Sequence, residues 1–242
     1  MRRMVKKYIT ALRLLIFDRR TFFKVLFSNY FGRYDIFIFY IKTKINSYFL
    51  LNKKRLFIDL GANIGQAYKF FIDIYPNEHY DYILVEPNKF CVDKLKLLVD
   101  NSNVTILQSA AWTKKEQKLF YGVAESGNNT SLGASIITNH KTGSYHLQKE
   151  AAVLVETFDF SKFLLEKSMI YDEIIVKMDV ESSEYDILEK LINDKNIILI
   201  DRLFVEFHSN WMKKSKLKDT YILREKKLVD TLPLYTKLHI WV

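Results

Sequence analysis

The 242-residue chain is 49% apolar and 15% aromatic, which is enough to bury an α/β core and excludes an intrinsically disordered protein. Its single cysteine, Cys91, excludes an internal disulfide and a cysteine-based metal cage and fits a reducing compartment. The net charge of +9 is unevenly distributed. Residues 1–54 hold 13 Lys/Arg and two acids, whereas residues 55–242 hold 24 Lys/Arg and 26 acids. Nucleic-acid binding by residues 55–242 is therefore disfavoured.

The first 54 residues form a basic segment rich in aromatic and aliphatic side chains. Residues 4–17 are expected to form a helix that places Val5, Ile9 and Leu12 on one face. The segment has no signal-peptide cleavage pattern and no run of ~20 apolar residues, which a membrane span requires. Two interpretations stay open: helices packed on the main domain, or a basic amphipathic surface that contacts anionic lipid or an acidic partner. We expect a cytoplasmic protein, with peripheral membrane contact as the alternative.

From residue 55 onwards, apolar strands alternate with amphipathic helices. The pattern predicts strands over 55–60, 82–87, 104–112, 118–123, 173–180 and 201–208, and helices over 64–74, 89–99 and 182–192. Such alternation is typical of a parallel sheet covered by helices on both faces. The runs "TLPLY" and "KLHIWV" are expected to form a C-terminal antiparallel hairpin. The predicted fold is therefore α/β, with a mostly parallel Rossmann-like domain in residues 55–242 and a basic helical segment in residues 1–54.

Ligands of such sheets bind beyond the carboxyl ends of the strands, near the point where the strand order reverses. The side chains expected at this edge are Asp59, Glu86, Asp179 and His208, each of which lies near the end of a predicted strand. The candidate binding and catalytic residues should therefore converge there, although they lie far apart in the sequence.

The stretch "FIDLGANIGQ" (57–66) places two of the seven glycines, Gly61 and Gly65, in the turn after Asp59. Glycine permits a tight turn and the close approach of a ligand. The turn lacks the G-x-G-x-x-G spacing of dinucleotide sites, and Asp59 would repel a diphosphate. A cationic adenosine cofactor, S-adenosylmethionine, fits better, with Glu86 accepting hydrogen bonds from both ribose hydroxyls. In the alternative interpretation, Asp59 and Glu86 are acids that only favour a helix dipole.

Five stretches, "FIDLGANIGQ", "ILVEPN", "SAAW", "VKMDVESSEYDILEKLI" and "FVEFH", follow one another as they do in the FkbM-type methyltransferases. The chain resembles this family over roughly residues 55–210, and "VKMDVE" followed by "SEYDIL" is the most specific part. The resemblance implies an S-adenosylmethionine-dependent enzyme with a Rossmann-like class I methyltransferase sheet. Many members of the family O-methylate sugars or polyketide-type hydroxyls.

The same resemblance implies roles for individual cofactor-binding residues. Asp59, Gly61, Asn63 and Gly65 would line the methionine end, Glu86 and Asn88 would lie at the ribose, and Ser109 and Ala110 would lie near the adenine. The chain departs from the family at Ser182, where glycine usually follows "DVE". Ser182 or Ser183 can cap the following helix, but a serine would be strained if the position required a positive φ.

Methyl transfer to a hydroxyl requires that the acceptor oxygen is aligned and that its proton is removed. Asp179 is the first candidate for the base. Side chains alternate along strands, so equal offsets of 29 residues predict that Lys177 meets Glu206 inside the sheet and that Asp179 meets His208 at its mouth. Asp179 and His208 are therefore the predicted catalytic residues. The alternatives are helix capping for Asp179 and ordinary hydrogen bonding for His208.

A divalent metal held by Asp179, Glu181 and His208 is a less favoured prediction, because no spacing in the sequence requires it. The polar stretch 122–150 predicts either a flap over the acceptor or a surface insertion. Its candidate acceptor contacts are His140, Tyr145 and His146. Trp112 and Trp211 are expected either to stack on a sugar ring or to pack in the core.

The function that these features favour is S-adenosylmethionine-dependent O-methylation of a hydroxyl on a sugar, glycan or glycosylated small molecule. One alternative is an RNA methyltransferase that docks through residues 1–54, which the charge of residues 55–242 disfavours. The other is a non-catalytic, membrane-associated module, which the presence of Asp59, Glu86 and Asp179 disfavours.

Overall fold

The computed structural model describes residues 53–99, 102–123, 133–138, 140, 152–212 and 215–241. The expected helix over residues 4–17 lies outside these ranges, as do Tyr145 and His146 of the expected flap. The strands and helices that carry the predicted site lie within them.

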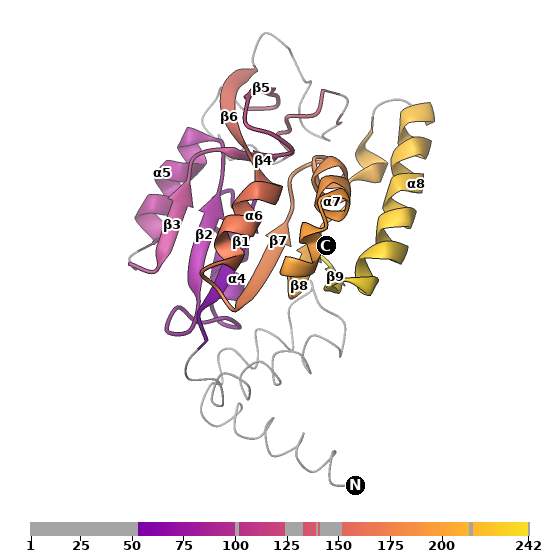
Figure 1. The fold of residues 1–242 in the computed structure, drawn as a ribbon. Helices are drawn as coiled ribbons and strands as arrows, with labels where there is room; N and C mark the ends of the chain where they lie inside the picture. Colours follow the sequence, from indigo (N-terminus) through magenta and orange to yellow (C-terminus); the bar gives the residue numbers. More distant parts are fainter. Residues whose placement is uncertain are drawn as a thin grey trace, which may run out of the picture.

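A six-stranded sheet forms the centre of the described part, with the strand order β3-β2-β1-β7-β8-β9. Its strands are β1 (Arg55–Leu60), β2 (Asp81–Val85), β3 (Val104–Leu107), β7 (Glu173–Met178), β8 (Arg202–Val205) and β9 (Lys237–Ile240). Neighbouring strands of this sheet all run parallel. The chain moves outward from β1 to β3 and later returns to the other side of β1 (Figure 1). The predicted parallel α/β sheet is confirmed, and its strand order reverses between β1 and β7.

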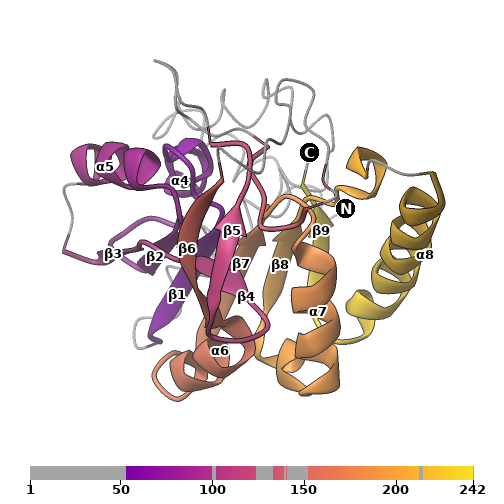
Figure 2. The same ribbon diagram turned by 90° about the horizontal axis from the view of Figure 1, so that it is seen from above.

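Helices cover both faces of the sheet (Figure 2). On one face lie α4 (Gln66–Phe71) and α5 (Lys89–Leu98), on the other α6 (Phe160–Ser168) and α7 (Glu184–Asn193), while α8 (Ser215–Thr231) packs against α7. The short 3-10 helices are η2 (Asn196–Leu199), η3 (Ser209–Trp211) and η4 (Leu232–Leu234). Because side chains alternate along β1, Leu56 and Ile58 pack with the α6–α7 layer and Phe57 with α4. Burial on both faces explains the continuous apolar strands.

A smaller sheet lies beyond the carboxyl ends of the central strands (Figure 1). It consists of β4 (Ala110–Trp112), β6 (Val153–Asp159) and β5 (Gln117–Phe120), with β4 parallel and β5 antiparallel to β6. The prediction of one strand over 104–112 was wrong, because pairing with β2 ends at Leu107 whereas Ala110 pairs with Thr157 of β6. β6 was not predicted, because its adjacent apolar residues Val153 and Leu154 are both exposed and break the alternation.

The predicted C-terminal antiparallel hairpin was also wrong. The run "TLPLY" continues from α8 into η4, which has Pro233 near its start, and β9 then joins the sheet parallel to β8. A helix between two strands brings the second strand back in the same direction as the first, which a two-stranded hairpin cannot do. α8 was not predicted, because its described residues bury only Tyr221 and Leu228 within a largely charged sequence.

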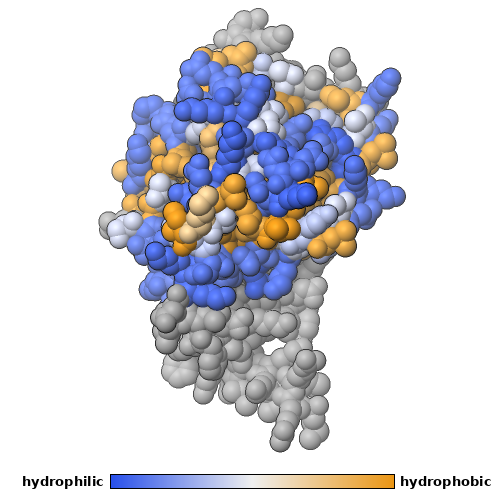
Figure 3. All heavy atoms as spheres, in the orientation of Figure 1, coloured by the Kyte–Doolittle hydropathy of each residue, from blue (hydrophilic) through white to orange (hydrophobic). Residues whose placement is uncertain are grey.

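Polar and apolar side chains are mixed on the face that carries α6 and α7 (Figure 3). Exposed apolar residues of this face include Leu165, Met169 and Ile198. Individual exposed apolar side chains are normal on protein surfaces. Among the described helices, no helix combines the length and apolarity needed to cross a membrane.

Candidate functional site

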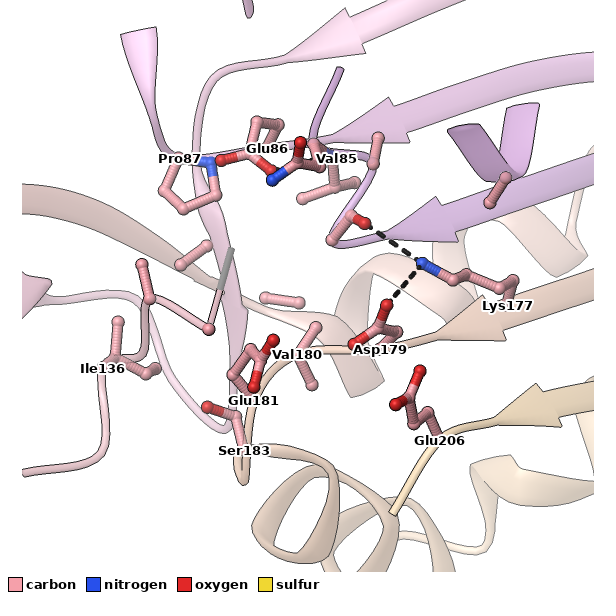
Figure 4. A pocket seen from close by; sticks show the side chains of 18 of the residues that line it. Val85, Glu86, Pro87, Ile136, Lys177, Asp179, Val180, Glu181, Ser183 and Glu206 are labelled. Atoms are coloured by element: carbon pink, nitrogen blue, oxygen red, sulfur yellow. Dashed lines mark hydrogen bonds and ion pairs between the residues drawn. The ribbon is translucent and has the colours of Figure 1, made fainter. Parts of the chain in front are cut away.

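A cavity of about 390 Å³ lies at the carboxyl edge of the sheet, where the strand order reverses (Figure 4). Its walls come from the turns after β1, β2, β7 and β8, from α4 and β4, from the residue after β9, and from a short piece of the loop that follows β5. Predicted site residues that border it are Gly61, Asn63, Glu86, Ser109, Ala110, Asp179 and Glu181. Asp59, Gly65, Asn88 and His208 lie behind this lining. The expected convergence of the strand ends is therefore present.

The two glycines of the turn after β1 make room for the chain itself. Gly61 has φ 79° and Gly65 has φ 90°, a backbone region that residues with side chains rarely adopt. A Cβ at Gly61 would clash with the carbonyl oxygen of Asp179, and one at Gly65 would clash with Leu98 of α5. The glycines thus allow β1, β7 and α5 to approach closely, and Gly61 also borders the cavity.

The carboxylate of Glu86 is held by main-chain groups on both of its oxygens. Oε2 accepts a hydrogen bond from the backbone N–H of Asn63 (2.9 Å), and Oε1 accepts one from that of Asn88 (2.8 Å). Burial raises the pKa of Glu86 to about 7, although these two N–H donors oppose the rise. Asn88 is the N-cap of α5, because its side chain accepts from the N–H of Phe90 (3.0 Å). When ionised, Glu86 keeps acceptor sites for ligand hydroxyls.

The opposite wall of the cavity combines the predicted Ser109 with residues that the sequence did not reveal. Ser109 donates its hydroxyl to the carbonyl of Glu156 (2.8 Å), which fixes its place in the lining. Ala134 and Ile136 line the cavity and are buried. Ser183 also lines it, and its buried Oγ has no hydrogen-bond partner among the described residues (Figure 4). This oxygen is therefore available to a polar ligand atom.

Lys177 links the two halves of the site from within the sheet. Its Nζ lies 3.2 Å from Asp59 Oδ1 and 3.3 Å from Asp179 Oδ2, and it donates to the carbonyl of Gly61 (3.1 Å; Figure 4 draws the last two contacts). Burial alone would lower the pKa of Lys177, but the two carboxylates raise it above its usual value. Burial raises the pKa of Asp59, which Lys177 opposes. Asp59 is fully buried and faces Lys177.

The predicted Lys177–Glu206 pair was wrong, because the strand register differs by two residues from the expected one. Lys177 pairs with Phe204, an offset of 27, and the N–H of Glu206 donates to Met178 O (3.0 Å). Glu206 therefore lies next to Asp179 at the strand ends and borders the cavity. Burial and the charge of Asp179 raise the pKa of Glu206 to about 7.

His208 does meet Asp179, but another acid holds it more closely. His208 Nε2 lies 3.8 Å from Asp179 Oδ1, whereas the backbone N–H (3.0 Å) and Nδ1 (3.2 Å) of His208 both contact Glu184 Oε1. Burial alone would lower the pKa of His208, but Glu184 and two further carboxylates raise it to about 10. At neutral pH His208 is therefore cationic. Glu184 was missed because it lies 24 residues away on the first turn of α7.

The predicted metal-ligand set differs from the group that the structure brings together. The donor atoms of Asp179, Glu206 and His208 lie within 4.8 Å of one another, so Glu206 takes the place expected for Glu181. Nε2 of His208 also forms ion pairs with Asp179 (3.8 Å) and Glu206 (3.7 Å). Charge pairing accounts for this proximity without an ion, so the metal stays the less favoured prediction.

The three remaining candidates of the sequence are now placed. The Trp112 ring packs in the core under Lys118 (4.0 Å), and Trp211 is exposed away from the cavity lining. Instead, Trp241 lines the cavity, and its backbone N–H donates to the carbonyl of Val205 (2.8 Å). Ser182 has φ 77°, so the strain that its departure from glycine would bring is present, and Ser183 is the N-cap of α7.

Comparisons with known proteins now define the family. Residues 59–229 match the model of the methyltransferase FkbM domain, which covers more than half of the chain. The chain belongs to the FkbM methyltransferase family. A crystal structure of methyltransferase FkbM from Methylobacillus flagellatus KT is similar at 15% identity and a TM-score of 0.42, over 73% of this chain and 37% of that one. The present chain thus spans little more than a third of that relative. No curated protein matches the sequence.

Proposed function

We propose that the protein is an S-adenosylmethionine-dependent O-methyltransferase that acts on a hydroxyl of a sugar or glycan. One observation carries this proposal. In a chain of the FkbM family, one cavity at the strand-order reversal places Glu86 on one side and the carboxylates of Asp179 and Glu206 on the other. The first suits a ribose, and the second suits an acceptor hydroxyl that must lose its proton.

The lining of the cavity supports S-adenosylmethionine as the ligand. Its charged members among the described residues are the acids Glu86, Asp179, Glu181 and Glu206 and the base Lys177. Such an excess of acids favours a sulfonium cation and disfavours a diphosphate. Glu86 can accept both ribose hydroxyls, and Ser183 Oγ offers a further polar contact to the nucleoside.

The cofactor would supply an electrophilic methyl group, so the chain has to orient the acceptor oxygen and accept its proton. Asp179 and Glu206 border the cavity from adjacent strand ends, which places two carboxylates near one acceptor. We assign proton acceptance to Glu206, whose pKa of about 7 suits a base near neutral pH, and orientation of the hydroxyl to Asp179. His208, cationic and buried, would stabilise both carboxylates instead of acting as the base.

The aromatic rim supports a sugar as the acceptor. Trp241 and Phe70 line the cavity with their rings 5.6 Å apart, and Trp241 follows the strand next to that of Glu206. A sugar ring has an apolar C–H face and hydroxyl edges, which match an aromatic surface beside carboxylates.

We also propose that the basic residues 1–54 contact an anionic membrane surface. Flotation with anionic and neutral vesicles tests that contact, and equal recovery with both would reject it.

The enzymatic proposal is tested in two steps on the full chain. Calorimetry with S-adenosylmethionine and S-adenosylhomocysteine should give binding heat, which a non-catalytic module would lack. Release of S-adenosylhomocysteine is then measured with a panel of sugars and glycans, and mass spectrometry identifies the methylated product. Absence of binding heat rejects the cofactor, whereas binding without transfer to any hydroxyl of the panel rejects the acceptor class.

A further inference from the structure

Residues 133–138 and His140, here called the wall segment, lie against the turn that joins β7 to α7. Ser135 exchanges two backbone hydrogen bonds with Tyr121 (2.8 and 3.0 Å), and His140 forms a backbone bridge with Met212. Ala134 and Ile136 of the wall segment line the candidate cofactor cavity. The contacts that hold the wall segment in place therefore also keep this part of the cavity wall in position.

His140 connects the wall segment to the β7–α7 turn through both of its ring nitrogens. The side chain is buried, with Nδ1 2.8 Å from Ser182 Oγ and Nε2 2.9 Å from Glu181 Oε2. Nε2 faces the Glu181 carboxylate, and Nδ1 forms a hydrogen bond with the Ser182 hydroxyl, which in turn donates to Met212 Sδ (3.5 Å). Since both nitrogens are used, His140 is not available as the acceptor contact that the sequence suggested.

The turn that His140 contacts has an unfavourable backbone conformation. Glu181 has φ 50° and Ser182 has φ 77°, so two consecutive residues with side chains lie in the left-handed region. Glycine would relieve the strain at Ser182, but it would remove the hydroxyl that bonds to His140. The wall segment adds a second contact, in which Ser135 Oγ donates to the carbonyl of Glu181. Serine at position 182 therefore keeps a strained backbone conformation but gains a hydrogen bond to the wall segment.

The same link fixes a carboxylate that faces the catalytic side of the cavity. Glu181 borders the cavity, and its Oε2 lies 2.9 Å from His140 Nε2 and 3.4 Å from His208 Nε2. The two imidazole rings are 5.8 Å apart and nearly perpendicular. Glu181 is therefore held between two rings, one of which belongs to the wall segment.

We propose that His140 is a positioning residue: it latches the wall segment onto the β7–α7 turn and holds the Glu181 carboxylate toward His208. Its effect on methyl transfer rests on the proposed function, whereas the latch itself can be measured without any ligand. The two nitrogens have separable tasks. Both hold the segment, Nδ1 through Ser182 and Nε2 through the Glu181 carboxylate, but only Nε2 orients Glu181.

Three variants of the full chain separate these tasks. The shorter amide of His140→Asn can replace the Nδ1 contact to Ser182 but not the Nε2 contact to Glu181, and the longer amide of His140→Gln can do the reverse. Amide exchange of the wall segment is followed by mass spectrometry, and the imidazole signals of His208 by NMR at fixed pH. His140→Ala should accelerate exchange of the segment about tenfold, the effect of losing roughly one hydrogen bond. His140→Asn and His140→Gln should each keep part of the protection, but only His140→Asn should shift the His208 signals.

A matched pair at Ser182 keeps the test valid if the His140 variants fail to fold. Ser182→Ala and Ser182→Gly both lose the hydroxyl, but only glycine relieves the strain. Both should speed exchange of the wall segment, although Ser182→Gly should melt at a higher temperature than Ser182→Ala. Wild-type exchange in Ser182→Gly and His140→Ala would overturn the latch, and unchanged His208 signals in His140→Asn would overturn the positioning of Glu181. If the variants show none of these effects and the wild type binds S-adenosylhomocysteine, this inference alone is overturned. If the variants show them and the wild type binds no S-adenosylhomocysteine, the proposed function alone is overturned.

Discussion

The two halves of the cavity hold their carboxylates in different ways. In the β1–β2 half, backbone N–H groups bind both oxygens of Glu86. In the β7–β8 half, Asp179 and Glu206 are surrounded by charged side chains, chiefly Lys177 and His208. Main-chain donors persist when a side chain is replaced, but a charged network changes with each of its members. The first half should therefore tolerate substitution around its carboxylate, and the second should not.

The turns of the two halves differ in the same sense. Gly61 and Gly65 adopt positive φ at little cost. Glu181 and Ser182 adopt it with side chains that then contact His140. Strain that side-chain contacts hold in place is typical of functional sites. Under the proposed function, the first half would bind the cofactor and the second would carry out the chemistry on the acceptor.

Glu206→Gln should produce the largest change. It removes the proposed proton acceptor but keeps the shape of the side chain, so methyl transfer should fall by about 10²–10⁴-fold. Wild-type turnover should rise as the pH passes about 7, because Glu206 becomes ionised there and only the ionised form accepts a proton. The measurement is S-adenosylhomocysteine release against pH.

Asp179→Asn is the matched control for Glu206→Gln. It should lower turnover but keep an inflection in the pH profile, because Glu206 still titrates, and the loss of the neighbouring charge should move that inflection below pH 7. Affinity for S-adenosylhomocysteine should change little in either variant. If Glu206→Gln keeps full activity while Asp179→Asn loses it, Asp179 is the base, as the sequence first suggested.

Lys177→Met tests how strongly the two halves are coupled. The variant leaves the buried carboxylate of Asp59 and the nearby Asp179 without their shared cation, and removal of one partner of a buried ion pair costs about 3–5 kcal/mol. Urea unfolding at neutral pH measures the loss. The double variant Lys177→Met/Asp59→Asn should recover part of it, because one uncompensated charge is gone. A loss below about 1 kcal/mol would mean that Lys177 contributes little to either half.

Sequence patterns identified the β1–β2 half more accurately than the β7–β8 half, and the reason is physical. Gly61, Asn63 and Glu86 belong to turns whose form depends on nearby residues, and all three border the cavity as expected. The register of β7 against β8 depends on the α7 helix and the η2 turn between them, so the expected Lys177–Glu206 contact was two residues out of register. Local patterns do not encode such an offset.

Contacts between distant segments were likewise beyond the sequence. His140 reaches Ser182 across 42 residues, and Lys177 reaches the carbonyl of Gly61 across 116. Glu184 looked like an ordinary acid in the first turn of a helix, yet it holds His208. The sequence therefore indicated which residues gather at the carboxyl edge, but not which of them hold one another.

Glu86→Gln should reduce affinity for S-adenosylmethionine by about ten- to a hundredfold, because an amide cannot accept hydrogen bonds from two hydroxyls and two N–H groups at once. The pKa of Glu86 is raised to about 7, and the ionised form is the better acceptor, so wild-type affinity should increase as the pH rises through 7. Calorimetry at several pH values measures both effects. An affinity that is independent of pH in the wild type would place the ribose elsewhere.

Asn88→Ala should have the smallest effect, and it tests the main-chain character of the β1–β2 half directly. The Asn88 side chain caps α5, whereas its backbone N–H binds Glu86 and remains in any variant other than proline. Loss of the cap should cost about 1 kcal/mol of stability, which Asn88→Asp should restore because aspartate is an equally good N-cap. Affinity for S-adenosylhomocysteine should meanwhile change by no more than about threefold, well under the effect of one hydrogen bond to a charged group. A large loss of affinity in Asn88→Ala but not in Asn88→Asp would show that Glu86 depends on side chains after all, and the two halves would then be alike.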